Sequence, residues 1–307
     1  MAESDRTASL MSPARLAQMN PKTPATPAAW LNQMAADAGH QHVKRIGELG
    51  ELLQEQATST ELSSLATRLE QFSATLPTLD FSLLEPRGWW ARTTGKGSGG
   101  GAEFADRFEQ INAAAQSLIG HGAALRKEHQ ADSAVTDRAL VELDVEYHAM
   151  EKILEQGARW LQDMRNQLKV RQTAATDLQS QRAVIEDANR CDILVTRLKL
   201  LRSLCNAAVQ VQGQVRENAA RRLALTQTLQ QSLASELKTW HGRLSAVASV
   251  ARGGKSSAHG LHGPMEAHQE LQSSVTKAAS ACHQLLQQEQ ALAQSLMALS
   301  RHDAPSA

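Results

Sequence analysis

The chain has 307 residues and a formal net charge of zero, because 32 basic residues balance 32 acidic ones. This balance gives no global electrostatic field that would favour nucleic acid as a partner. Aromatic residues make up only 3% of the sequence, and Ala, Leu, Gln, Arg and Glu are abundant, as is typical of long helices.

Cysteine usage and the apolar runs bear on the compartment. Cys191, Cys205 and Cys282 are an odd number of widely spaced cysteines without a CxxC pair, which argues for a reducing compartment. The N-terminus lacks an apolar core behind a basic region, and no window of about 18 apolar residues occurs. We therefore expect a cytoplasmic protein, with peripheral contact at the inner membrane face left open.

The first third of the chain predicts a tail, two short helices and a linker. Residues 1–29 are rich in Pro, Ser and Thr without a repeating apolar face, which predicts a disordered tail. Apolar residues at helical spacing predict short helices within residues 30–78. Residues 79–103 are rich in Pro and Gly and predict a linker. Gly95, Gly97 and Gly100 satisfy GxGxxG, but no strand precedes them, so a flexible linker is favoured over a phosphate cradle.

Residues 104–301 predict a bundle of long helices. Gly120-His121-Gly122 indicates a break or kink, and Thr173–Asp177 a turn with Thr176 as N-cap, although one continuous helix over 140–205 competes with that turn. From Thr176 to Val250 apolar residues recur every three or four positions, a heptad-like seam that includes Ile185, Val195 and Leu223. Residues 252–264 predict a loop, and Pro264 begins a last helix.

The last helix carries a strict heptad seam from Leu271 to Leu299, in which Glu289 is the polar member that sets register. Taken together, these patterns predict an all-α fold, an elongated helical bundle with long antiparallel coiled-coil helices.

Charge is segregated along the predicted hairpin. Acidic residues dominate from Asp137 to Glu155, and basic residues dominate from Arg190 to Arg222. The favoured interpretation is mutual neutralisation across an antiparallel hairpin, with Glu155 beside Cys191 and Glu142 beside Leu204. An oxyanion-binding face is the alternative.

Candidate chemical groups are few. His259, His262 and His268 lie near one loop, but no carboxylate or cysteine completes a zinc set, so a polar linker is favoured over a metal site. The three cysteines fall on apolar seams, which predicts buried, inert thiols. With no catalytic motif in view, we expect no enzymatic activity, cofactor or metal.

Two segments carry a family resemblance. They are Val211-Gln212-Gly213-Gln214-Val215-Arg216 with Asn218, and Leu237–Leu244 around Trp240. With these segments the chain resembles the toxic anion resistance family of bacteria, the TelA/KlaA-like proteins, over about residues 77–300. The resemblance implies a role in resistance to tellurite and similar oxyanions and in envelope stress, exerted non-enzymatically through protein or membrane-surface contacts.

Several residues are candidates for those contacts. The anion or partner candidates are Arg197, Lys199, Arg202, Arg216, Asn218, Arg221, Arg222 and Trp240. Trp89 and Trp90 either cap the end of the bundle or anchor the chain to a membrane or partner. The expected partner is an unidentified protein, with self-association left open and no nucleic acid. The rival functions are a cysteine-dependent oxyanion-processing enzyme, for which Arg190 and Arg202 flank two of the thiols, and a purely structural coiled-coil scaffold.

Overall fold

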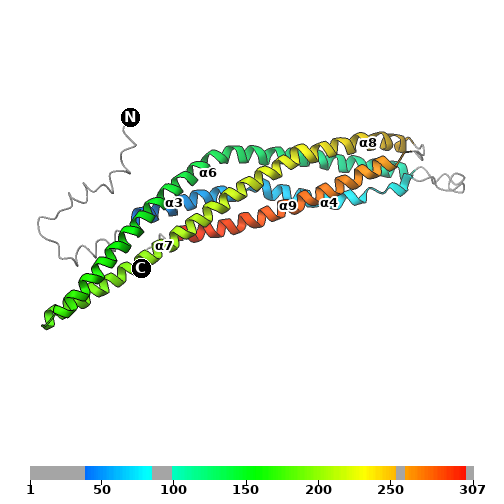
Figure 1. Cartoon of the computed structure of the whole chain (residues 1–307). Coiled ribbons are helices and arrows are strands. Elements are labelled where there is room, and N and C mark those ends of the chain that lie inside the picture. The colour runs from blue at the N-terminus through cyan, green and yellow to red at the C-terminus, as the bar shows by residue number, and fades with distance from the viewer. Residues whose placement is uncertain (1–38, 85–98, 254–259, 302–307) are drawn as a thin grey trace, which may run out of the picture. The chain divides into compact units, whose positions relative to one another are not determined.

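The computed structural model describes residues 39–84, 99–253 and 260–301, and the regular structure of these residues is helical (Figure 1). The predicted all-α helical bundle is therefore confirmed. The predicted tail over 1–29 and the Trp89-Trp90 pair lie outside the described residues. The elements in order are α3 (His40–Ala57), α4 (Thr60–Thr75), the 3₁₀ turns η2 (Leu76–Thr78) and η3 (Phe81–Leu84), α6 (Gly99–Ala174), α7 (Leu178–Gln227), the π-helix η4 (Thr228–Leu233), α8 (Ala234–Arg252) and α9 (His262–Arg301).

The chain divides into two compact units, and α3, α6 and α7 each contribute residues to both. Among the described residues, unit 1 holds 39–46 and 144–208. Unit 2 holds 47–84, 99–143, 209–253 and 260–301.

Unit 1 contains the predicted helical hairpin. Helix α6 ends at Ala174 and α7 begins at Leu178, so the turn is confirmed and the continuous helix is wrong. The cap of α7 is Asp177 rather than the predicted Thr176, because Asp177 Oδ1 accepts a hydrogen bond from the Ser180 amide at 2.8 Å. Ser180 Oγ donates to Asp177 Oδ2 at 2.6 Å, and this hydrogen bond, followed by the amide one, lowers the pKa of Asp177. A carboxylate here also suits the positive end of the helix dipole.

The predicted register of this hairpin is wrong. Pairing Glu155 with Cys191 would set Gly157 opposite Asn189. Instead, Gly157 lies opposite Leu198, and a Cβ added to Gly157 would be only 2.8 Å from Leu198 Cδ2. Arg171 also bridges the two helices by an ion pair with the buried Asp187 at 2.6 Å. Exposed charge pairs are worth only about 0.2–1 kcal/mol each, so close packing decides the register instead.

Unit 2 contains the main hydrophobic core, in which α9 packs against both α4 and α8. Its largest fully buried side chains include Trp240, Phe104, Phe108 and Ile111. Helix α6 begins at Gly99, so the end of the predicted linker is helical. A Cβ at Gly101 would lie 2.4 Å from the Ala251 carbonyl oxygen, which explains a glycine at this close approach.

Two further helix boundaries differ from prediction. Helix α6 runs without interruption through Gly120 and Gly122, so the predicted break is wrong. Tertiary packing of the surrounding turns outweighs the helix propensity that two glycines lose, about 1 kcal/mol each. Helix α9 begins at His262, two residues before Pro264, and its predicted seam from Leu271 to Leu299, with Glu289, is buried as expected.

The seam of α7 is displaced by one residue at several positions. Ile185 is 60% exposed and Leu223 is 46% exposed, whereas Val184 and Arg222 are buried. The error arises because apolar residues are adjacent at such places, as at Val184-Ile185. The helix therefore carries two apolar stripes, and the sequence alone does not say which faces the core.

Candidate functional site

The most unusual polar feature of unit 2 is a buried ion pair between α7 and α9. Arg222 Nε donates to Glu289 Oε1 at 3.0 Å, and Arg222 Nη2 donates to the same oxygen at 2.5 Å. Both residues belong to the buried interior of unit 2. Burial raises the pKa of Glu289, while the guanidinium of Arg222 opposes that shift by attraction and hydrogen bonding.

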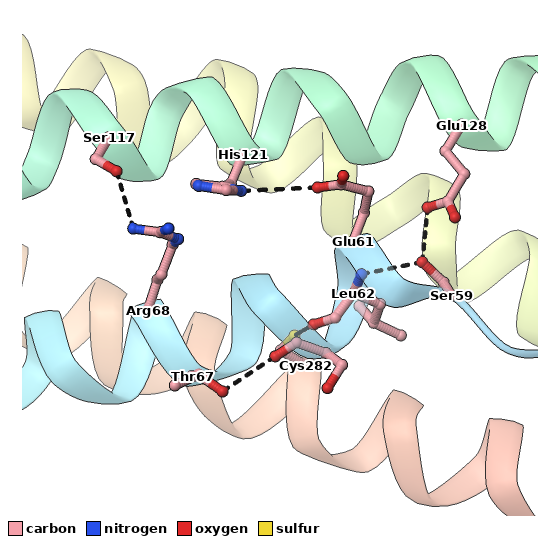
Figure 2. Close-up of polar contacts among 10 residues, drawn as sticks. Ser59, Glu61, Leu62, Thr67, Arg68, Ser117, His121, Glu128 and Cys282 are labelled. Atoms are coloured by element: carbon pink, nitrogen blue, oxygen red, sulfur yellow. Dashed lines mark hydrogen bonds and ion pairs between the residues drawn. The ribbon is translucent and has the colours of Figure 1, made fainter.

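Ser59 connects this pair to two more helices. As N-cap of α4, Ser59 Oγ accepts from the Leu62 amide at 2.9 Å and donates to Glu128 Oε2 of α6 at 2.7 Å (Figure 2). Its backbone N–H also hydrogen-bonds to Glu289. A single serine thus joins the start of α4 to α6 and to the charged pair.

A cavity of about 60 Å³ lies beside the ion pair. Its polar lining includes Gln56, His129, Asn218, Arg222 and Glu289. Asn218 is 7% exposed, and its Nδ2 makes no hydrogen bond to a described group; Gln56 Oε1 likewise has none. Burial, followed by the charge of Arg222, lowers the pKa of His129, although Asp132 and Asp137 act in the opposite direction. The lowered pKa favours the neutral imidazole at pH 7.

The arrangement suits a structural role better than ligand chemistry. The cavity is well below the roughly 300–1,000 Å³ typical of small-molecule sites. The guanidinium of Arg222 is neutralised by Glu289, so it does not offer a free charge to an anion. A charged pair at one position of an otherwise apolar seam instead disfavours other registers, since a slip would leave two charges buried without partners.

The other predicted basic contacts are spread over both units. Arg197, Lys199 and Arg202 lie in unit 1, whereas Arg216, Asn218, Arg221 and Arg222 lie in unit 2. Arg221 forms an exposed ion pair with Glu217 one turn away on the same helix. Within unit 2, the cavity lining brings Asn218 and Arg222 together.

Trp240 is a core residue and is not available as a contact for an anion or partner. It is fully buried, and its Nε1 donates to His268 Nδ1 at 3.1 Å. Its ring packs against Phe108 with centroids 5.1 Å apart. Gln272 Nε2 lies 3.1 Å from His268 Nε2, and burial lowers the pKa of His268. Trp240 therefore fixes the packing of α8 against α9.

The three thiols are free and buried, as their seam positions predict. Burial raises the pKa of Cys205 to about 11 and that of Cys282 to about 12, and it also raises the pKa of Cys191. Cys282 Sγ donates to the Leu62 carbonyl oxygen at 3.7 Å (Figure 2). Since the thiolate is the reactive form, these values favour unreactive thiols at neutral pH.

The histidine cluster is only partly described, because His259 lies outside the described residues. His268 belongs to the core network, and His262 is exposed at the start of α9. In the part of the chain that the structure describes, no group of three His, Cys, Asp or Glu side chains has metal-binding geometry. Within the same ranges, no helix combines the length and apolarity needed to cross a bilayer.

Sequence reasoning missed Ser59, Glu128 and His129 as members of the polar cluster. A signal was present at Ser59, because a serine between two helical patterns and three residues before Leu62 is a typical N-cap position. Glu128 and His129 carried no such signal, since polar residues on a long helix are ordinarily solvent-facing.

Comparison with known proteins adds no relative, since no family model, curated protein or solved structure matches the chain.

Proposed function

We propose that this protein is a non-enzymatic factor in resistance to toxic oxyanions such as tellurite, and that it acts by binding another macromolecule through the unit 1 hairpin, residues 144–208 of α6 and α7. The observation that carries the binding role is the row of large exposed apolar side chains on α7 of this hairpin: Leu178, Ile185, Ile193 and Leu200. Large apolar patches on soluble proteins commonly mark sites of interaction.

The placement of the reactive groups supports a non-catalytic mode of action. Cys191, Cys205 and Cys282 are buried with raised pKa values, and Glu289 is occupied by Arg222. A hydrated oxyanion would have to shed its water to reach any of these side chains, which is costly in an apolar core. These groups are therefore better suited to packing than to turnover.

The link to toxic anions has a separate support. It rests on the Val211–Arg216 and Leu237–Leu244 segments, whose residues resemble the toxic anion resistance family. The experiment must therefore test the link to the anion independently of the binding surface.

Growth on tellurite of a strain lacking the gene, complemented with variants, provides this test. We expect the deletion to lower resistance and the wild-type chain to restore it. Ile185→Glu combined with Ile193→Glu should fail to restore it, because two charges would disrupt the exposed apolar face. Val209→Glu, a change at an exposed residue about half a turn around α7 from Leu200, is the matched control and should restore it.

Other results would contradict the proposal. A deletion strain as resistant as its parent would overturn the role in anion resistance and favour a structural scaffold. Replacement of all three cysteines by alanine should leave resistance intact. Loss of resistance in that variant, at normal protein level on a blot, would favour a thiol-dependent enzyme instead.

A further inference from the structure

The outer face of α7 in unit 1 carries a second, solvent-exposed apolar stripe. Leu178, Ile185, Ile193 and Leu200 are 75%, 60%, 58% and 40% exposed. They are spaced by seven, eight and seven residues, so at 3.6 residues per turn they fall within about 80° of one another around the helix. Exposed Arg182, Asn189 and Thr196 lie between them on the same face. We call these seven residues the α7 stripe.

The α7 stripe is symmetric about Asn189. Ile185 and Ile193 lie four residues on either side of it, and Leu178 and Leu200 lie eleven residues on either side. Two copies of the helix packed antiparallel about a two-fold axis at Asn189 would therefore place Ile185 against Ile193 and Leu178 against Leu200, each contact occurring twice. Self-complementarity of this kind is the requirement for an isologous dimer interface.

We propose that the α7 stripe is a homodimer interface, in which two copies of this chain pack antiparallel about Asn189. This inference deepens the proposed function, and rests on it, by identifying the macromolecule bound by the unit 1 hairpin as a second copy. Each copy would remove four large apolar side chains from water, and burial of such side chains is the main driving force for stable association.

One pair of opposite charges lies beside the stripe in this arrangement. A two-fold axis between antiparallel helices brings the same flank of both helices together. Glu186 and Arg197 lie on one such flank of α7. Arg197 of the second copy would lie level with position 181, which is five residues from Glu186. At about 1.5 Å per residue, the two side chains are about 7.5 Å apart along the helix axis. Glu186 is 67% exposed at its side chain, in a long contact of 3.8 Å with Arg190, so its carboxylate remains accessible to a second cation.

The polar members of the stripe favour a protein partner over a lipid surface. Arg182, Asn189 and Thr196 alternate with the apolar residues, whereas a membrane-bound helix presents a continuous apolar face. Asn189 would meet its own copy on the two-fold axis, where the side-chain amides can hydrogen-bond to each other. An asparagine at such a position fixes the register of paired helices at some expense of stability.

Light scattering coupled to size exclusion, over a micromolar dilution series, measures the association. We expect the full chain to show about twice its mass of 33.3 kDa. Ile185→Glu combined with Ile193→Glu should return it to the monomer mass, with an unchanged circular dichroism spectrum because both residues are exposed. Val209→Glu should remain dimeric. A wild-type chain that stays monomeric throughout the series would overturn the proposal.

Cysteine cross-linking tests the register and the direction of the helices. Asn189→Cys should form a disulfide-linked dimer under mild oxidation, whereas the wild-type chain should not, because its own thiols are buried. Thr196→Cys alone should not cross-link, since the two copies of this residue would be about 21 Å apart. Arg182→Cys combined with Thr196→Cys should cross-link. Efficient linking through Thr196→Cys alone would indicate parallel helices and overturn the arrangement.

The two proposals fail in different ways. A monomeric wild-type chain whose hairpin variant loses tellurite resistance would overturn the homodimer and retain the hairpin as the binding surface for another molecule. A dimeric wild-type chain whose monomeric hairpin variant still confers resistance would support the interface and overturn the role of the hairpin in resistance.

Discussion

Arg222 and Glu289 are both buried in the core of unit 2, where each charge is stabilised by the ion pair with the other. Arg222→Met should destabilise the fold by about 3–5 kcal/mol, since it leaves an unpaired buried carboxylate. Combining it with Glu289→Leu should recover most of that loss, because paired apolar residues of similar volume need no desolvation of charge. Urea denaturation followed by circular dichroism measures both effects.

The pH dependence of the Arg222→Met variant provides an independent check. Without the guanidinium, burial remains the main influence on Glu289 and holds its folded pKa above the unfolded value. Stability is then present below the unfolded pKa and lost as pH rises through the folded one. The single variant should therefore recover stability when the pH is lowered from 7 towards 4, and a loss over that range would contradict the assignment.

The thiols should be silent towards reagents that require a thiolate. With pKa values of about 11 and 12, Cys205 and Cys282 should resist an aromatic disulfide reagent at pH 8 in the folded chain, while all three thiols react in denaturant. The neutral thiol is favoured by folding, so its contribution to stability is present below the unfolded pKa and lost as pH rises from about 9 towards 12. Rapid labelling of Cys205 or Cys282 in the native protein would contradict this prediction, because it would show that the buried face of α7 or α9 opens to solvent.

At the scale of the helix, two glycines of α6 should respond oppositely to alanine. Nothing lies within 4 Å of a Cβ built at Gly120, so Gly120→Ala should stabilise unit 2 by about 0.5–1 kcal/mol through helix propensity. At Gly101 the new Cβ would meet the Ala251 carbonyl oxygen at 2.4 Å, so Gly101→Ala should lower the melting temperature. Thermal melts of the two variants, side by side, separate propensity from packing.

The same helices show how far the sequence predicts the structure. The α9 seam was predictable because its steps alternate four and three without exception from Leu271 to Leu299. On α7 the pairs of adjacent apolar residues offered two faces, and the choice depends on which neighbour packs there. The hairpin turn was visible in the sequence, but its register was not, because the close approach of Gly157 to Leu198 is a tertiary event.

The candidate site was less predictable than the fold. Glu289 stood out as the polar member of a regular seam, whereas Arg222 was one of several arginines in a basic segment. Nothing in the sequence distinguishes the arginine that will be buried, since the distinction depends on a partner 67 residues away on another helix.

At the scale of the whole molecule, the two units should differ in local stability. The hydrophobic cluster that includes Trp240 and Phe108 lies entirely within unit 2. Amides of α4, α8 and α9 should therefore exchange with deuterium more slowly than those of the unit 1 hairpin. The hairpin should open more easily because fewer buried side chains hold its helices together. Mass spectrometry of peptides from both units measures this, and equal protection would contradict the ranking.

The π-helix η4 has a consequence for how the chain tolerates insertions and deletions. Leu225, Leu229, Leu233 and Leu237 are buried at three successive steps of four, which would rotate an ordinary α-helical stripe by about 120°. The wider i→i+5 turn absorbs this drift and keeps Trp240 facing the core. Removing one residue, such as the exposed Gln231, would make the helix regular and keep α8 in phase, because the lost rotation of about 100° matches the drift that the π-turn absorbs. A single-codon deletion should therefore be accepted within η4, whereas one in the regular turns of α7 or α8 beside it would turn Trp240 out of the core by about 100°.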